Sequence, residues 1–449
     1  MLHLKGGALV RGLVRQYSSR AAYNAYITRA TQHLYNMDDA FSIQPVARFV
    51  GESEPEFACF SYDDEHKFHH GDSSLRWYYT PQLGVDLSQG YETFIKHDDS
   101  QDEHLDSLLK TIIHHEQKTK KKIDANIVTW RGCLTKVYYC FLLTTPESCQ
   151  VRLKTEMGMI PHVLCSMIKR CPADFGHRFE LNATLYQANS GQSFIEENHE
   201  YRVHSQQEQA SQPWRGAIPQ EVMQFWGYKF ETLATLPAPW GETSREYIEN
   251  RENEVVNNKA QYCSVVRTGI GKTVLCLGGE VDAVWDSKPP KAGDPVNWVE
   301  LKTSIDIRNG RDQENFQRKL LKFWIQSFLL GVPKIIVGFR SRDGILQRLE
   351  EIDVASIPTT VAQRGRQWDG NVCINFASAF LEWLRTKIDD DGVWRIRRRA
   401  RDTHIEVYKT KETTGHGRIL TDEFINHRIK LSLPPVPNVS EGDGAEEPS

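Results

Sequence analysis

Apolar residues alternate or cluster along most of the chain, and their spacing predicts a mixture of strands and helices. Short runs rich in β-branched and aromatic residues predict strands over residues 127–130, 137–143, 274–285, 298–302 and 334–339. Longer runs with apolar residues at helical spacing predict helices over residues 219–233, 316–330 and 376–387. Gly331 and Pro333 fit the end of the second helix, because helices commonly stop at a glycine that is followed by a proline.

This interleaving also predicts the fold class. Strands and helices that are mixed over nearly the whole chain favour one α/β (α+β) domain over two independent domains. A chain of 449 residues is long enough for one large domain or two ordinary ones. We therefore expect a single catalytic domain over residues 38–433, between a basic leader at residues 1–37 and a disordered acidic tail at residues 434–449.

The leader contains no Asp or Glu, and its basic residues are Lys5, Arg11, Arg15, Arg20 and Arg29. The segment around Arg11 and Arg15 would form a basic amphipathic helix, which is typical of a mitochondrial transit peptide. A short basic arm of a cytoplasmic or nuclear protein is an equal alternative. Both interpretations place the protein inside the cell.

Charge and metal-ligand content limit the function classes. The 55 Lys and Arg residues oppose 59 Asp and Glu residues, giving a formal net charge of −4. A nucleic-acid-binding protein with this balance must concentrate its positive charge in a cleft. The nine cysteines show no paired spacing suited to zinc, and reduced thiols fit an intracellular protein. The histidine pairs 69–70 and 114–115 also lack metal-ligand spacing, and no apolar run could cross a membrane.

Two pairs of charged residues predict a metal and phosphate site. Glu280 and Asp282 are two positions apart in a predicted strand, so both carboxylates project from one face, where burial is costly without a cation. Glu300 and Lys302 share a face of the next predicted strand by the same rule. An acid followed one hairpin later by Glu-x-Lys is the order found in PD-(D/E)xK metal nucleases. In such a site, carboxylates hold Mg²⁺ or Mn²⁺, the metal activates water, and lysine offsets charge on the phosphate.

Each of these signals has an ordinary structural alternative. Glu-x-Lys is common as a salt bridge on an exposed strand. Glu231 lies near the end of a predicted helix and shares a stripe with Gln224 and Tyr228, so it is either a third metal ligand or a solvent-facing glutamate. Arg131 closes a predicted strand, where it suits either bidentate phosphate binding or a surface salt bridge.

Several ordered stretches resemble the DXO family of decapping exoribonucleases in its fungal form. They run through most of the chain and comprise residues 75–81, 85–92, 127–136, 227–231, 280–282 with 300–302, and 321–328 followed by 331–333. The resemblance implies two mixed β-sheets flanked by helices around a PD-(D/E)xK-like nuclease core, which agrees with the predicted elements.

The resemblance also implies residue roles. Four acids would bind the divalent metal, Mg²⁺ or Mn²⁺, with two ions during catalysis: Glu231, Asp282 and Glu300 directly, and Glu280 directly or through water. The residues implied to contact the scissile phosphate, the attacking water or the RNA 5′ end are Lys302, Gln326 and Arg131. We also assign Gln224, on the stripe of Glu231, to substrate binding.

The implied activity is removal of incomplete or non-canonical caps, including NAD caps, with release of the cap nucleotide and 5′–3′ degradation of the RNA. The substrates would be RNAs with capped, NAD-capped or 5′-phosphorylated ends. Some relatives bind a 5′–3′ exonuclease, but no segment here identifies such a contact. Two alternatives remain open: a PD-(D/E)xK nuclease that acts on DNA, and a non-catalytic partner or stabiliser of a 5′–3′ exonuclease.

Overall fold

The computed structural model describes residues 56–140, 177–187, 191–213, 216–291, 293–364, 368–400, 402, 405–411 and 415–433. These residues all belong to one compact unit, Glu52–Ser449. The predicted leader and acidic tail lie outside the described residues, so the predicted domain boundaries and the two interpretations of the leader stay predictions. Among the described helices, none is both long enough and apolar enough to cross a membrane.

The described strands form two mixed sheets, as expected. The larger has nine strands in the order β15 (Glu406–Lys409), β14 (Trp394–Arg398), β5 (Phe179–Tyr186), β6 (Gln192–Glu197), β4 (Ile127–Trp130), β9 (Thr273–Glu280), β8 (Gln261–Ile270), β1 (Glu56–Tyr62) and β2 (Phe68–His70). Within it, β4 runs parallel to both β6 and β9. The smaller has six strands in the order β13 (Leu346–Asp353), β12 (Lys334–Arg340), β11 (Trp298–Ile305), β10 (Ala283–Val284), β3 (Trp77–Tyr78) and β7 (Thr235–Leu236).

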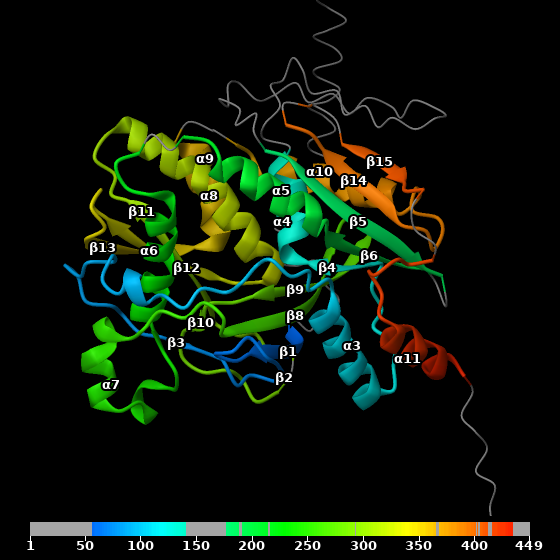
Figure 1. Cartoon of the computed structure of the whole chain (residues 1–449), viewed down its shortest axis with the longest axis horizontal. Coiled ribbons are helices and arrows are strands. Elements are labelled where there is room, and N and C mark those ends of the chain that lie inside the picture. Colours follow the sequence, from blue (N-terminus) through cyan, green and yellow to red (C-terminus); the bar gives the residue numbers. More distant parts are fainter. Residues whose placement is uncertain are drawn as a thin grey trace, which may run out of the picture. The chain divides into compact units, whose positions relative to one another are not determined.

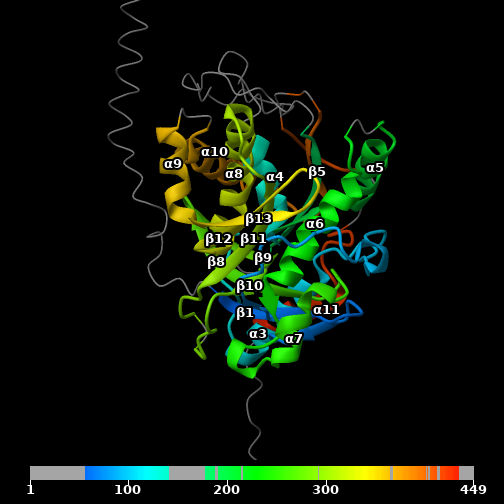
Figure 2. The same ribbon diagram turned by 90° about the vertical axis from the view of Figure 1, so that its left-hand side faces the viewer.

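Helices cover both sheets (Figures 1 and 2). Those described are α3 (Asp106–Thr119), α4 (Arg131–Cys140), α5 (His199–Ala210), α6 (Gln220–Leu233), α7 (Arg245–Asn250), α8 (Gly310–Leu330), α9 (Ile357–Gln363), α10 (Gly370–Leu384) and α11 (Asp422–Ser432). Figure 1 shows α3 and α11 on one side of the large sheet, and α4, α8 and α10 on the other. Helix α6 packs against β11 of the small sheet.

The predicted helices are present, and residues at their ends determine where they begin and stop. Helix α8 begins after Asn309, whose side chain accepts a hydrogen bond from the backbone N–H of Asp312, and it ends at Gly331 in the left-handed conformation. Helix α6 begins immediately after Pro219, as predicted. Helix α10 begins at Gly370, earlier than the predicted residue 376, because the side chain of Asp369 caps it.

Two strand predictions are wrong in part. Residues 137–140 belong to α4 rather than to a strand, and residues 141–143 lie outside the described residues. Leu134, Val137 and Tyr138 are buried at helical spacing, where α4 packs against α8 and α10. The periodicity of a short, buried apolar run does not distinguish a helix from a strand. The predicted strand over residues 274–285 is also interrupted, because residues 281 and 282 lie outside both β9 and β10.

Candidate active site

The candidate site lies where the chain passes from the large sheet to the small one. Strand β9 ends at Glu280 in the large sheet, and β10 begins at Ala283 in the small sheet. The period-two rule had predicted that Glu280 and Asp282 lie in one strand. This prediction is wrong, because β9 ends at Glu280 and Asp282 comes before β10. They are nonetheless close enough for the charge of Asp282 to raise the pKa of Glu280. The crossing between the sheets thus brings the two acids together.

Glu300 and Lys302 lie on one face of β11, as predicted. The Lys302 Nζ atom is 2.6 Å from Glu300 Oε1, and the Glu300 side chain is only 1% exposed. Val299 and Leu301, which alternate with them, pack in the core that includes α6. The exposed salt-bridge alternative is therefore wrong for this pair, because the carboxylate is buried.

Arg131 and Asp282 complete the contacts around this pair. Arg131 begins α4 directly after β4, and its Nη1 atom lies 3.3 Å from Glu300 Oε2. Asp282 Oδ2 accepts a hydrogen bond of 2.6 Å from the backbone N–H of Leu301 and lies 3.9 Å from Lys302 Nζ. The Arg131 side chain is 12% exposed and that of Glu300 only 1%, so their contact is not a surface salt bridge.

Glycines in β9 allow Arg131 to approach. Trp130 pairs with Gly278 across β4 and β9, and a Cβ atom added to Gly278 would lie 2.7 Å from the Trp130 ring. A Cβ atom on Gly279 would lie 3.0 Å from the Cβ of Arg131 and 2.8 Å from Leu330 Cδ1. Larger residues at these positions would push α4 away from the sheet, so the Gly-Gly pair fixes the position of Arg131 beside Glu300.

The pKa directions show that the site holds an excess of negative charge. Burial first, and then neighbouring carboxylates, raise the pKa of Glu280 to about 7 and that of Asp282 to about 6. Burial, Asp282 and Glu280 also raise the pKa of Glu231 well above its usual value, so Glu231 belongs to the same cluster. The Glu231 side chain is half-buried in α6 rather than exposed.

The two cations in the cluster act mainly on Glu300. Burial raises the pKa of Glu300, but Lys302 and Arg131 outweigh that effect and hold the pKa below its usual value. Burial likewise lowers the pKa of Lys302, but Glu300, Asp282 and Glu231 outweigh it and raise that pKa. Lys302 is therefore charged at neutral pH. Glu300 is paired with both cations, whereas Glu231, Glu280 and Asp282 have less positive charge to balance them.

This donor set fits a hard divalent cation. Carboxylate oxygens are the ligands that Mg²⁺ and Mn²⁺ prefer, and the surplus acids are Glu231, Glu280 and Asp282. A cation held between them would relieve the repulsion that raises their pKa values. Within the described residues, the acids are not gathered into a trio whose ligand atoms all lie within 4.8 Å of one another.

The other predicted site residues lie on the flanking helices. Gln326 is half-buried in α8. Gln224 is exposed in α6, about 10 Å along the helix axis from Glu231, so its assignment to the substrate stays a prediction. Burial raises the pKa of Tyr228, on the same stripe; a hydrogen bond with Asn258 opposes this effect, and the charges of Glu231 and Glu280 add to it.

One cation near the site was not predicted from the sequence. Lys322 is open to solvent, but desolvation and then the charges of Lys302, Lys136 and Arg131 lower its pKa. Lys322 is therefore close enough to Lys302 and Arg131 for their charges to act on its amino group. Lys322 stands one helical turn before Gln326, so the i, i+4 spacing in the predicted helix was the signal that could have identified it.

Comparison with known proteins identifies nuclease relatives that match most of the chain. A family model described as RAI1 like PD-(D/E)XK nuclease matches residues 54–425. Decapping nuclease RAI1 of Neurospora crassa is 56% identical over 442 residues, which are 97% of this chain and 98% of that protein.

Solved structures agree. Candida albicans Rai1 in complex with pU5-Mn²⁺ is 30% identical with a TM-score of 0.72, covering 84% of this chain and 95% of that one. Scheffersomyces stipitis Rai1, in complex with (3′-NADP)⁺ and a calcium ion, is 27% identical with a TM-score of 0.70 and the same coverage.

The resemblance drawn from the sequence motifs is thereby confirmed, as is the fold of two mixed sheets around a nuclease core. Family model, overall identity and architecture agree over nearly the same residues. The chain belongs to the RAI1 like PD-(D/E)XK nuclease family.

Proposed function

We propose that the protein is a metal-dependent RNA decapping nuclease that hydrolyses a phosphodiester-type bond at the RNA 5′ end. The observation that carries this proposal is the cluster of four acids, buried or half-buried, around Lys302 at the crossing between the sheets. The 56% identity to a protein named Decapping nuclease RAI1 supports RNA caps as the substrate class, in preference to DNA.

Glu231, Asp282 and Glu300 would hold the metal directly, and Glu280 would hold it directly or through water. When bound, a divalent cation supplies polarisation of the phosphate and a more acidic water. The Rai1 structures with Mn²⁺ and with calcium support a divalent ion for this chain. We further propose Mg²⁺ or Mn²⁺ as the working ion and two ions per site, which the number of acids permits.

The chain's own cations position the substrate. Lys302, held in place by Glu300 and Asp282, directs an ammonium group toward the space between the acids, where it offsets charge that develops on the phosphate. Arg131 presents a guanidinium that suits bidentate contact with a 5′-terminal phosphate. Lys322 and Gln326 lie on one face of α8 and would contact the same phosphates or the attacking water.

The cap specificity is a finer proposal. Because S. stipitis Rai1 was solved with (3′-NADP)⁺ and C. albicans Rai1 with pU5, we propose that this chain accepts both NAD-capped and 5′-phosphorylated RNA. It would release the cap nucleotide as a unit and then degrade the exposed RNA in the 5′–3′ direction. Incomplete caps would be removed by the same chemistry.

A panel of 5′ ends on one RNA sequence tests this proposal. Purified protein is incubated with incompletely capped, NAD-capped and 5′-monophosphorylated RNA, and with DNA of the same sequence, and the products are separated by chromatography. We expect intact cap nucleotides from the capped RNAs, mononucleotides from the monophosphorylated RNA, and no reaction in excess chelator. Faster hydrolysis of DNA than of every RNA would assign the site to the alternative substrate.

A further inference from the structure

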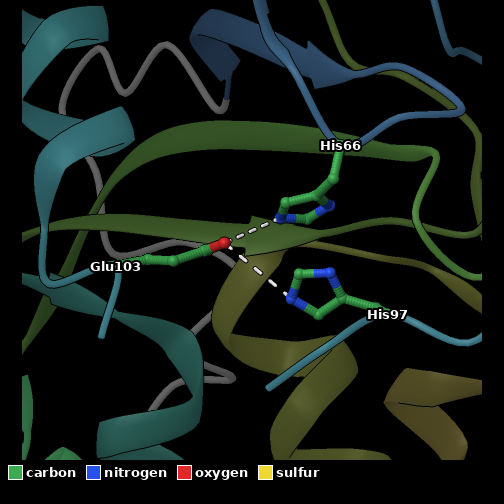
Figure 3. Close-up of side chains that lie close together, drawn as sticks. All are labelled: His66, His97 and Glu103. Carbon is green, nitrogen blue, oxygen red and sulfur yellow. Dashed lines mark hydrogen bonds and ion pairs between the residues drawn. The ribbon is translucent and has the colours of Figure 1, made fainter. Parts of the chain in front are cut away.

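Two histidines and a glutamate that do not belong to the four-acid set converge on one another. His66 lies in the turn between β1 and β2, and His97 and Glu103 both lie in the loop that precedes α3. Each offers one ligand atom, and the three atoms lie within 4.8 Å of one another. Figure 3 shows both imidazole rings and the Glu103 carboxylate turned toward a common point.

Hydrogen bonding fixes the orientation of the first ring. His66 Nδ1 is 2.8 Å from the backbone carbonyl of Lys259, and a carbonyl can only accept, so Nδ1 carries a proton. Nε2 of the same ring then faces Glu103 Oε1 at 2.9 Å. A lone pair facing a carboxylate oxygen is repulsive, so a positive group, either a proton on Nε2 or a metal ion, must lie between them.

The second ring, that of His97, also lies near Glu103. His97 Nε2 is 3.8 Å from Glu103 Oε1 and 3.8 Å from Asp99 Oδ1, which is too long for a hydrogen bond to either. A proton on His66 explains its short contact with Glu103, and packing of the two imidazole rings, whose centroids are 3.9 Å apart, places His97 beside His66. A metal ion would in addition use all three ligand atoms, which lie within 4.8 Å of one another.

The spacing fits tetrahedral zinc. Two ligands about 2.1 Å from Zn²⁺ at a tetrahedral angle lie about 3.4 Å apart. The contacts of Glu103 Oε1 with the two histidines, 2.9 and 3.8 Å, fall on either side of this value. Glu103 is 49% exposed, so its carboxylate can shift by a few tenths of an ångström. The donor set of two imidazoles and a carboxylate also differs from the all-oxygen set that suits Mg²⁺.

We propose that His66, His97 and Glu103 form a Zn²⁺ site, with Asp99 or water as the fourth ligand, that ties the β1–β2 turn to the loop before α3. The backbone carbonyl of His104, next to Glu103, accepts a hydrogen bond of 2.9 Å from Trp130 Nε1. The metal therefore holds a segment that also supports Trp130, the neighbour of Arg131. Its role is structural, and it is independent of the proposed decapping function.

The test measures Zn²⁺ binding at the trio alone, after two carboxylates of the acid site have been replaced by amides. Full-length protein carrying Asp282→Asn and Glu300→Gln is stripped of metal, and Zn²⁺ binding is measured by calorimetry. The same measurement follows with His97→Ala added. We expect one tightly bound Zn²⁺ per chain in the first protein, and affinity on the order of 100-fold weaker after His97→Ala. His69→Ala, which removes a histidine of the same hairpin, is the matched control and should leave the affinity unchanged.

A second readout excludes a trivial folding defect. Co²⁺ is used as a probe, because four-coordinate Co²⁺ with imidazole ligands absorbs strongly in the visible range. We expect this absorption in the parent protein and its loss in both His97→Ala and Glu103→Gln, while all metal-free proteins unfold at similar temperatures. Equal Zn²⁺ affinity with and without His97, or no Zn²⁺ binding when the trio is intact, overturns the proposal. Either result leaves decapping by the acid site untouched.

Discussion

Replacing Glu280 by glutamine should make the metal-free protein more stable at pH 8 while weakening its metal binding. Burial and the charge of Asp282 raise the pKa of Glu280 from 4.5 to about 7 in the folded protein. The folded state therefore binds this proton more tightly than the unfolded chain does. Stability from this group is greatest below pH 4.5 and is lost as the pH rises to about 7.

The magnitude follows from the size of the shift. At about 1.4 kcal/mol for each pKa unit, an ionised Glu280 costs the metal-free protein up to about 3 kcal/mol at pH 8. Solvent at this half-buried group screens part of the charge, so a gain of about 1–3 kcal/mol is expected from Glu280→Gln. At pH 4.5 the gain should be much smaller, because the carboxyl is already largely protonated.

Urea unfolding of chelated wild-type and variant proteins at both pH values measures these differences. Glu221→Gln, which changes an exposed glutamate of α6, is the control and should change stability by less than about 0.5 kcal/mol. In the presence of Mn²⁺ the order should reverse, because the wild type gains more from the ion. An equal gain at both pH values, or a loss at pH 8, would refute the proposed electrostatic strain.

Three further changes probe the surroundings of the acids. Lys302→Met should abolish measurable hydrolysis and destabilise the metal-free protein by roughly 3–5 kcal/mol, since the buried Glu300 loses its main partner; single-turnover kinetics and urea unfolding check this. Gly279→Ala should lower kcat about 10–100-fold, because the added Cβ displaces Arg131, whereas Gly132→Ala meets no atom within 4 Å and should react normally. Lys322→Ala should raise KM for RNA and flatten its dependence on salt with kcat nearly unchanged, and a large fall in kcat at constant KM would contradict a phosphate contact.

The local part of the site could be predicted from the sequence. The alternation of a strand is a property of neighbouring residues, so Glu300 and Lys302 were correctly placed on one face of β11. The same rule placed Glu280 and Asp282 in one strand, although the chain changes sheets between them. Their proximity was predicted for a reason that the structure does not support, because a local rule contains no information on where one sheet ends.

Contacts between residues far apart in the chain could not be predicted from the sequence pattern. Arg131 meets Glu300 across 169 positions of the chain, and only the Gly-Gly pair of β9 hints that another element packs closely there. The trio of His66, His97 and Glu103 was missed because histidines were considered only as adjacent pairs. Residues 137–140 were misassigned because burial between two helices, rather than β-propensity, decides their conformation.

The central claim is that the acid cluster around Lys302 hydrolyses the RNA 5′ end. Its most direct test is single-turnover hydrolysis of NAD-capped RNA by wild-type protein and by Glu300→Gln, at matched Mn²⁺ concentration and with unfolding curves for both. We predict release of the intact cap nucleotide by the wild type, and a rate at least about 10³-fold lower for the folded variant. Undiminished cap release by folded Glu300→Gln would show that the chemistry lies elsewhere in the protein.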